Sequence, residues 1–351
     1  MPLNPLPYPV RPALPPPARR RRRWPWLLAG VLVLLALALL GWNALTGPTG
    51  KEAIVTIPKG ASAQEVARIL EEKELVRSKE AFLLLVRIKR ATPRLKSGTF
   101  RLSGRGTPAV LRQLETARPV TVRLTFPEGW RARDYARRLS RQGFDGAAFL
   151  RLALNPPEDL KPRYDEGPTL EGYLFPDTYV FPVDASAKEL IQVMLSRFDR
   201  EVTPERTQIL SVLGLSVHTW VTLASLVQAE AGSEEEMPWI AGVFLNRLEI
   251  GMPLQSDPTV AYALDKDLPE LDRTKGDFAA DSPYNTYKHA GLPPGPINNP
   301  GAVALDAVLH ARRLSPAGKP YLYFFHAKGR LYLNETFKGH LRDLNRYRYA
   351  P

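Results

Sequence analysis

The stretch VTIPKGASAQEVARILEEKELVRSKEAFLLL (residues 55–85) decides the fold class, because its pattern returns as LTFPEGWRARDYARRLSRQGFDGAAFLRL (residues 124–152). Each copy starts with a short β-type run and continues through a Pro-x-Gly turn. Each then enters an amphipathic helix, with apolar residues at helical spacing. Two copies of one strand–turn–helix unit predict an α+β fold.

On the N-terminal side lies WPWLLAGVLVLLALALLGWNALTG (residues 24–47), and no charged residue occurs between Arg23 and Lys51. Its apolar part approaches the ~20 residues that cross a bilayer, and tryptophans flank it as interfacial residues do. Five arginines precede it, so the positive-inside rule places residues 1–23 in the cytoplasm. A cleaved signal peptide has a shorter apolar region, and a buried core helix does not follow five arginines. We therefore expect one transmembrane anchor at residues 24–46.

Composition narrows the function classes of the 351-residue chain. It has no cysteine, which excludes disulfides and thiolate metal sites. The five histidines are scattered without HxxxH spacing, so we expect no metal centre. Half of the net charge of +12 comes from the arginines of residues 1–23, and the rest is spread among many acids. Without an aromatic–basic stripe, we expect no nucleic acid as partner.

The remainder of the chain alternates turn-rich strings with helices. Helices are expected at residues 187–202, 217–232 and 235–250. The string SPYNTYKHAGLPPGPINNPG (residues 282–301) is too rich in Pro, Gly and Asn for regular structure. KPYLYFFHAKGRLYLNET (residues 319–336) predicts a β-hairpin.

One acid stands out within TLASLVQAEAGSEEE (residues 222–236). Leu223, Leu226, Val227 and Glu230 fall at i, i+3, i+4 and i+7, so the glutamate continues a stripe that faces the core. The helix dipole near a C-terminus and the apolar neighbours both disfavour its charged form, which predicts a raised pKa. A carboxylic acid that keeps its proton near neutral pH is suited to general-acid cleavage of a glycosidic bond. The alternative is a surface glutamate on a frayed helix end.

Three further patterns concern candidate site residues or their neighbours. The acids Glu234 to Glu236 follow Ser233 in a capping-box pattern, which predicts helix-start acids that face solvent. Gln255 and Asp257 are two residues apart, so an extended segment points them to one face, although Asp257 can also cap the next helix. The loop with Tyr284, Asn285 and Thr286 offers aromatic, amide and hydroxyl groups, which bind sugars. A surface loop with incidental polar residues is the other reading.

Five strings in order carry a resemblance to a known family: LEGYLFPDTY, ASLVQAEAG, VFLNRLEIGMPLQSDPTV, SPYNTYKHAGLPPGPINNPG and PYLYFFHAKGRLYLNET. Together they closely resemble the endolytic peptidoglycan transglycosylases of the MltG or YceG-like family. The resemblance implies a bacterial, membrane-anchored lyase without cofactor or metal. Such an enzyme cleaves nascent glycan strands between N-acetylmuramic acid and N-acetylglucosamine without water, leaving a 1,6-anhydro end. The first repeat unit also looks like a LysM-type module, a small fold that binds N-acetylated glycans.

The resemblance places the family's catalytic glutamate on Glu230. Many relatives carry a second acid two residues earlier, where this chain has Gln228. The matching strings also put six residues near the substrate: Glu171, Gln255, Asp257, Tyr284, Asn285 and Thr286. With one acid, we expect Glu230 to protonate the leaving oxygen and then to accept the proton of the sugar's own 6-hydroxyl. The 2-acetamido group would stabilise the cationic centre.

We expect a cytoplasmic Pro/Arg-rich tail at residues 1–23 and a transmembrane helix at residues 24–46. A LysM-like module is expected at residues 51–120, followed by a YceG-like catalytic domain at residues 121–351 that begins with the second repeat unit. We expect a single-pass protein of the plasma membrane with its catalytic domain outside. Glycan strands are the expected substrate, and peptidoglycan synthases are candidate partners. Two alternatives stay open: a water-using muramidase with Asp257 or Glu171 as second carboxylate, and a non-catalytic glycan-binding scaffold for wall synthases.

Overall fold

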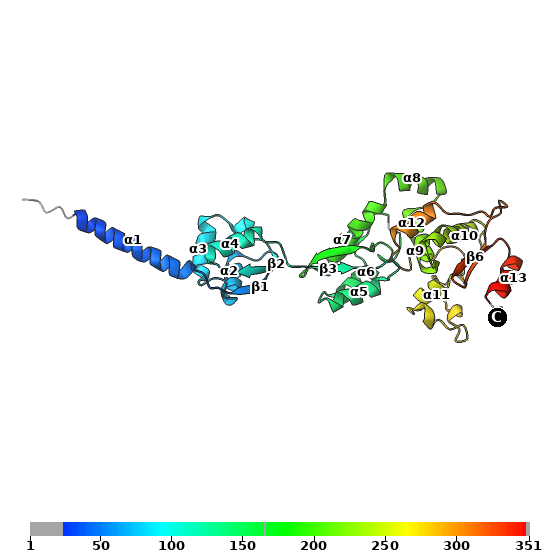
Figure 1. Cartoon of the computed structure of the whole chain (residues 1–351), viewed down its shortest axis with the longest axis horizontal. Helices are drawn as coiled ribbons and strands as arrows, with labels where there is room; N and C mark the ends of the chain where they lie inside the picture. Colours follow the sequence, from blue (N-terminus) through cyan, green and yellow to red (C-terminus); the bar gives the residue numbers. More distant parts are fainter. Residues whose placement is uncertain (1–23, 165, 349–351) are drawn as a thin grey trace, which may run out of the picture. The chain divides into compact units, whose positions relative to one another are not determined.

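The structure, a computed structural model, describes residues 24–164 and 166–348, so the predicted tail lies outside the described residues. The chain divides into two compact units at Arg118 and Pro119, each with its own hydrophobic core (Figure 1). Helices and three two-stranded antiparallel sheets make up the described part, which confirms the mixed helix and strand class.

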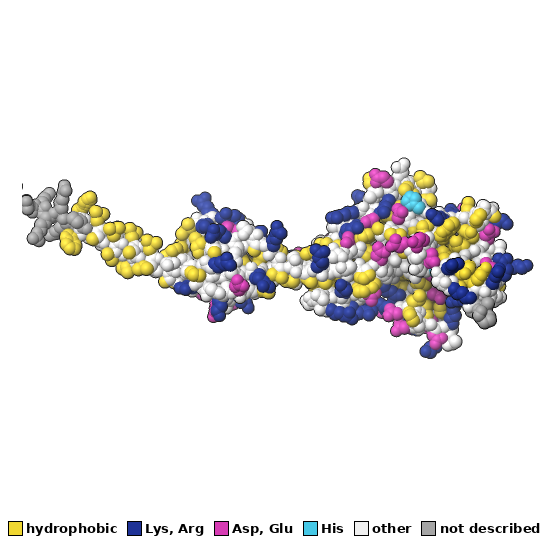
Figure 2. All heavy atoms as spheres, viewed as in Figure 1, with side chains coloured by type: hydrophobic (Ala, Val, Ile, Leu, Met, Phe, Trp, Pro, Cys, Tyr) yellow, Lys and Arg dark blue, Asp and Glu magenta, His cyan; other side chains and the backbone are white. Residues whose placement is uncertain are grey.

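The apolar segment forms the helix α1 (Trp24–Thr46). Among the described helices, α1 is long and apolar enough on its own to cross a membrane. Figure 2 shows its surface covered with hydrophobic side chains. The helices α8 (Pro204–Leu213) and α9 (Val217–Glu230) reach that composition only together, and they meet at 88°. Arg77 holds the C-terminal end of α1, because it donates hydrogen bonds to the carbonyl oxygens of Ala44 in α1 and of Pro48 just after it.

The first unit is a strand–helix–helix–strand arrangement. Its elements are β1 (Glu52–Ile57), α2 (Ala63–Glu72), α3 (Lys79–Ile88), the 3₁₀ turn η1 (Thr92–Arg94), β2 (Gly98–Ser103) and α4 (Thr107–Thr116). The strands β1 and β2 pair antiparallel with Val55 opposite Phe100, and both side chains enter the core. The hydroxyls of Ser62 and Ser78 accept the N-terminal N–H groups of α2 and α3. The LysM resemblance of this unit stays a prediction.

The second unit begins with the same order of elements. They are β3 (Thr121–Thr125), α5 (Ala132–Arg141), α6 (Gly146–Leu154), the 3₁₀ turn η2 (Glu158–Leu160) and β4 (Thr178–Pro182). The strands β3 and β4 pair antiparallel, with Leu124 opposite Tyr179. In both copies the glycine of the Pro-x-Gly turn has a φ of +76°, which favours glycine (Gly60 and Gly129). The repeated sequence is therefore also a repeated structure.

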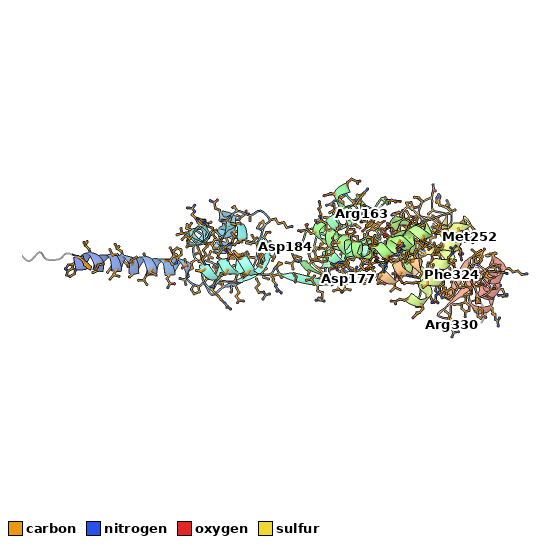
Figure 3. The ribbon with its side chains drawn as sticks, turned by 90° about the horizontal axis from the view of Figure 1, so that it is seen from above. Arg163, Asp177, Asp184, Met252, Phe324 and Arg330 are labelled. Carbon is orange, nitrogen blue, oxygen red and sulfur yellow. The ribbon has the colours of Figure 1, made fainter. Side chains whose placement is uncertain are left out.

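The remaining elements build around α9, whose residues from Trp220 to Val227 are buried. They are α7 (Ala187–Phe198), η3 (Asp199–Glu201), α8, η4 (Glu234–Glu236), α10 (Met237–Glu249), α11 (Asp257–Ala263), η5 (Leu268–Glu270), η6 (Asp277–Ala279), α12 (Ala302–Leu309), β5 (Tyr323–Ala327), β6 (Arg330–Asn334) and α13 (Phe337–Tyr347). The helices α10, α11 and α12 all contact α9. In Figure 3, Asp177 and Asp184 lie at one end of this unit, and Phe324 and Arg330 of the hairpin lie at the other. The predicted hairpin is confirmed.

The predicted helices are confirmed with shifted ends. The helix expected over residues 187–202 ends as α-helix at Phe198 and continues as the 3₁₀ turn η3. The helix expected to reach residue 232 stops at Glu230, with Ala231 as its C-cap. The next helix begins at Met237 rather than at residue 235, because the three glutamates form the 3₁₀ turn η4.

Candidate active site

Glu230 is the last residue of α9, the helix at the centre of the second unit. Its neighbours on the helix, Leu226 and Val227, have no exposed surface, whereas Glu230 is half-buried. The carboxyl group therefore lies where the core meets the surface. This is the position that the apolar stripe in the sequence predicts.

The surroundings of Glu230 raise its pKa to about 7. Burial is the largest cause, because it disfavours the charged carboxylate, and the negative charge of Asp257 acts in the same direction. Opposing them, the Ser256 hydroxyl donates a hydrogen bond of 2.6 Å to Oε1 of Glu230. The Arg247 guanidinium and the His326 imidazole also lower the pKa of Glu230. Near neutral pH, both the acid and the carboxylate form of Glu230 are populated.

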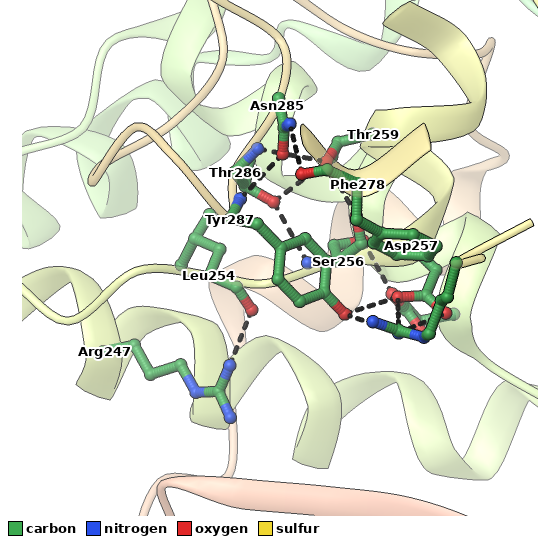
Figure 4. Close-up of polar contacts among 11 residues, drawn as sticks. Arg247, Leu254, Ser256, Asp257, Thr259, Phe278, Asn285, Thr286 and Tyr287 are labelled. Atoms are coloured by element: carbon green, nitrogen blue, oxygen red, sulfur yellow. Dashed lines mark hydrogen bonds and ion pairs between the residues drawn. The ribbon is translucent and has the colours of Figure 1, made fainter. Parts of the chain in front are cut away.

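Ser256 is the last residue before α11 and is held in place by Thr286, which lies in the loop after η6 (Figure 4). Its backbone N–H donates to the hydroxyl of Thr286 (3.0 Å), which is itself hydrogen-bonded to the hydroxyl of Thr259 (2.8 Å). On the other side, the guanidinium of Arg247 donates to the carbonyl oxygen of Leu254 (2.6 Å). The buried Thr286 thus positions the hydroxyl that contacts the acid.

Gln255 lies beside these residues with an exposed side chain and a φ of +47°. Residues other than glycine rarely adopt this left-handed conformation, and such strain is concentrated at functional sites. The backbone N–H of Gln255 donates to the carbonyl oxygen of Thr286 (3.2 Å), which fixes the conformation. The Gln255 side chain is therefore presented to solvent, one residue before the serine that contacts Glu230.

Asp257 is the first residue of α11, and its carboxylate contacts two side chains. The Tyr287 hydroxyl donates to Oδ1 of Asp257, and the Arg273 guanidinium forms an ion pair with the carboxylate (3.2 Å). The expected loop residue Asn285 is buried, and its amide donates to the carbonyl oxygens of Phe278 (3.1 Å) and Ala280 (2.9 Å). Asn285 thus supports the loop that carries Tyr287.

Tyr284 and Glu171 lie away from these contacts. The Tyr284 ring packs on the ring of Tyr262, with 4.8 Å between the centroids. Glu171 is buried at the start of α5, where its carboxyl accepts the N–H of Ala132 (2.9 Å) and the amide of Asn299 (2.8 Å). Burial raises the pKa of Glu171 to about 8. No hydrogen bond in the described part joins Glu171 to Glu230.

Two neighbours of the acid were not expected from sequence. Glu236 is half-buried rather than facing solvent, and its Oε2 accepts the Gly232 N–H and pairs with Nε2 of His326 (both 2.9 Å). The predicted capping box at Ser233 does not form, because the Glu236 carboxylate is used by these two groups. The pair holds the turn that follows Glu230. Within residues 24–164 and 166–348, no cluster of three or more acids and histidines could hold a metal.

The fold and this site define a class: α+β proteins with one half-buried, raised-pKa glutamate at the end of a core helix. The model of the YceG-like family matches residues 55–346, so the chain belongs to the YceG-like family. This confirms the resemblance found in the sequence.

Named relatives agree with this assignment. The endolytic murein transglycosylase of Bacillus subtilis is 32% identical over an alignment of 338 positions, which covers 90% of this chain and 91% of the relative. The protein of that name from Streptococcus pneumoniae D39 is 31% identical over 84% of this chain, which spans only 58% of the length of that relative. The crystal structure of a yceG-like protein from Listeria monocytogenes matches 84% of this chain and 99% of its own, with 32% identity and a TM-score of 0.55.

Proposed function

We propose that this protein is an endolytic murein transglycosylase, a lyase that cleaves peptidoglycan glycan strands between N-acetylmuramic acid and N-acetylglucosamine without water. The observation that carries the proposal is the half-buried Glu230, with a pKa raised to about 7. Two relatives that bear this name, in Bacillus subtilis and Streptococcus pneumoniae, support it.

In the proposed reaction, Glu230 serves first as acid and then as base. Its carboxyl proton moves to the glycosidic oxygen, and the bond between that oxygen and C1 of N-acetylmuramic acid breaks. The 6-hydroxyl of the same sugar then attacks C1, and its proton returns to the Glu230 carboxylate. A pKa near the working pH suits both steps. The products are a free 4-hydroxyl and a 1,6-anhydro end, and no water is consumed.

The contacts of the other carboxylates favour a single-acid mechanism over a muramidase. A hydrolase that uses water needs a second carboxylate placed for a water or for the sugar. Asp257 is engaged by Tyr287 and Arg273, and Glu171 is buried under hydrogen bonds from Ala132 and Asn299. We propose that Asp257 tunes the charge of Glu230, and that Glu171 acts by anchoring α5.

We assign direct substrate contacts to the candidate residues whose side chains are exposed, and indirect roles to those that are buried. Gln255 presents an exposed amide one residue before Ser256 and would hold a sugar hydroxyl, so that the 6-hydroxyl is already placed for attack. Tyr284 is half-buried and would offer a ring edge to the glycan. Asn285 and Thr286 are buried and would act indirectly, by holding the loop and Ser256.

The proposed layout places the reaction outside the bacterial plasma membrane. Residues 1–23 would form the cytoplasmic tail and residues 24–46 the single membrane span, since the arginine run precedes the apolar helix. Residues 51–120 would be a LysM-like glycan-binding module and residues 121–351 the catalytic domain. Anchoring would keep the enzyme near nascent strands, where peptidoglycan synthases are candidate partners.

Digestion of un-crosslinked glycan strands in H₂¹⁸O tests the proposal. The expected products carry 1,6-anhydro-muramic ends and no ¹⁸O, as measured by mass spectrometry. Reducing ends labelled with ¹⁸O would instead identify a water-using muramidase. Intact strands that the folded protein binds would favour the scaffold.

A further inference from the structure

The helix α5 differs in charge from α2, the helix at the same place in the first repeat unit. The buried positions agree, because Ala67 and Leu70 of α2 correspond to Ala136 and Leu139 of α5. The exposed positions do not agree. The charged residues of α2 are one arginine and three glutamates, whereas those of α5 are one aspartate and four arginines: Asp134, Arg133, Arg137, Arg138 and Arg141. Folding of the repeat therefore does not require the positive charge of α5.

Two of the arginines of α5 are not neutralised by the protein. The guanidinium groups of Arg133 and Arg137 form ion pairs with aspartates. Within residues 24–164 and 166–348, Arg138 and Arg141 form no ion pair with a carboxylate. They are three residues apart in the last turn of α5, so they share one face of the helix. This face carries two positive charges that can bind an anion.

An open hollow lies along the same face of α5. Its volume is about 510 Å³, and its lining residues are Trp130, Asp134, Arg137, Arg138, Arg141 and Gln142. The guanidinium of Arg138 lies over the Trp130 ring, 5.9 Å from its centre, and Arg141 is exposed. Figure 2 shows Lys and Arg side chains gathered where Figure 1 places α5. The volume is within the range of ligand sites, roughly 300–1,000 Å³.

Hydrogen bonds connect the hollow to the helix that carries the candidate acid. The carbonyl oxygen of Trp130 accepts the backbone N–H of Asn299 (3.0 Å). Two residues later, the backbone N–H of Gly301 donates to Oε1 of Gln228 (3.0 Å), which lies two residues before Glu230 in α9. One short segment thus contacts both Trp130 and the last turn of α9, so the hollow and the acid belong to one fixed surface.

We propose that this hollow binds the free carboxylates of the peptide stems carried by N-acetylmuramic acid. The planar guanidinium groups of Arg138 and Arg141 match the geometry of a carboxylate and can each donate two hydrogen bonds to it. The Trp130 ring offers an apolar surface to the methyl groups of the stem. The inference rests on the proposed function, since it requires that a glycan strand passes Glu230. It adds the part of the substrate that is recognised besides the sugars.

The connection to Glu230 decides between the anions that suit these arginines. A lipid headgroup or a phosphate would also pair with Arg138 and Arg141. The sugar chain itself is neutral where each lactyl group is joined to a peptide, so the carboxylates of an un-crosslinked strand lie on its stems. Every strand that reaches Glu230 therefore brings such carboxylates to the same surface of the protein.

Strands that differ only in their stem carboxylates test this. Un-crosslinked strands with acetylated stem amines are used directly or after carbodiimide coupling of their carboxylates to ammonia. Their binding to the full chain carrying Glu230→Gln, kept in detergent, is measured by calorimetry at low ionic strength. We expect the carboxylate strands to bind more tightly by roughly fivefold or more. Arg138→Gln combined with Arg141→Gln should reduce this preference below about twofold, and the exposed Arg141→Gln alone should at least halve it.

Arg123→Gln combined with Arg151→Gln is the matched control, because it removes the same charge from exposed positions of β3 and α6. It should keep the full preference. Equal binding of the two kinds of strand would overturn the proposal. So would a preference that survives the changes at Arg138 and Arg141 in folded protein, or one that the control also loses.

Competition separates the stem from a lipid. N-acetyl-D-alanyl-D-alanine should displace the carboxylate strands, whereas displacement by dihexanoyl phosphatidylglycerol alone would assign the hollow to a headgroup and overturn the proposal. Cleavage by the parent is scored separately. Cleavage without a carboxylate preference rejects the stem site and keeps the lyase, and a preference without cleavage does the reverse. If neither kind of strand binds, the stem proposal fails as well.

Discussion

Two substitutions next to Glu230 should move the pH limit of activity in opposite directions. The proposed mechanism needs a protonated Glu230, so the rate falls as the pH rises through its pKa of about 7. Ser256 donates to the carboxylate and thereby favours its charged form, whereas the negative charge of Asp257 disfavours that form. Ser256→Ala should therefore raise the pKa, and Asp257→Asn should lower it.

The size of each shift follows from the contacts. A hydrogen bond to a charged group contributes about 1.5–3 kcal/mol, and the half-exposed position of Glu230 puts this bond at the lower end. At about 1.4 kcal/mol per pH unit, Ser256→Ala should move the limit upward by roughly one unit. Asp257→Asn should move it downward by less than one unit, because Arg273 already offsets much of the charge of Asp257.

The assay is the rate of anhydro-end formation between about pH 5 and pH 9, with glycan strands well below saturation, so that the pH limit reports the free protein. Glu235→Gln, an exposed acid of η4, serves as control and should leave the limit unchanged. Equal limits in all three variants, or shifts of Ser256→Ala and Asp257→Asn in the same direction, would refute the assignment of the titrating group to Glu230.

Three further outcomes are expected. Gln255→Gly should leave Tm unchanged or raise it, because glycine adopts a φ of +47° without strain, while cleavage falls; a lower Tm would contradict this. Glu171→Gln should stabilise the protein by roughly 3 kcal/mol at pH 7. The pKa of Glu171 is about 8 in the folded protein against the ordinary 4.5, so the stability of the parent falls as the pH rises between these two values. Denaturant titrations should show this pH dependence in the parent and not in the variant. Asn285→Ala should cost about 2–4 kcal/mol in the same titrations, since two carbonyl oxygens lose their donor.

Local patterns in the sequence predicted the individual helices and strands better than they predicted which strands pair with each other. The repeat located β3 and the turn at Gly129, because alternation and turn chemistry are properties of adjacent residues. The strand that completes the second copy is β4, which pairs with β3 across the helices α5 and α6 and the turn η2. The periodicity of the sequence does not predict that β3 and β4 pair, because it reports only on neighbouring residues.

The site shows the same division. The position of Glu230 and its raised pKa follow from an apolar stripe and a helix end, which are local features. Ser256, which contacts the acid, carries no signal beyond being a serine near Asp257. The pairing of Glu236 with His326 joins residues 90 positions apart, and the capping-box pattern at Ser233 pointed to a different use of the same glutamate. A tertiary contact thus prevailed over a local preference.

The most direct test of the central claim compares Glu230→Gln with the exposed-acid control Glu235→Gln in the full chain. Both variants and the parent digest un-crosslinked glycan strands, and anhydro-muramic ends are counted by mass spectrometry. Glutamine keeps the shape of Glu230 and can still accept from Ser256, but it has no proton to give. The account predicts anhydro ends with the parent and Glu235→Gln, and none above background with a folded Glu230→Gln that still binds strands. Anhydro ends formed by Glu230→Gln at the parental rate would contradict it.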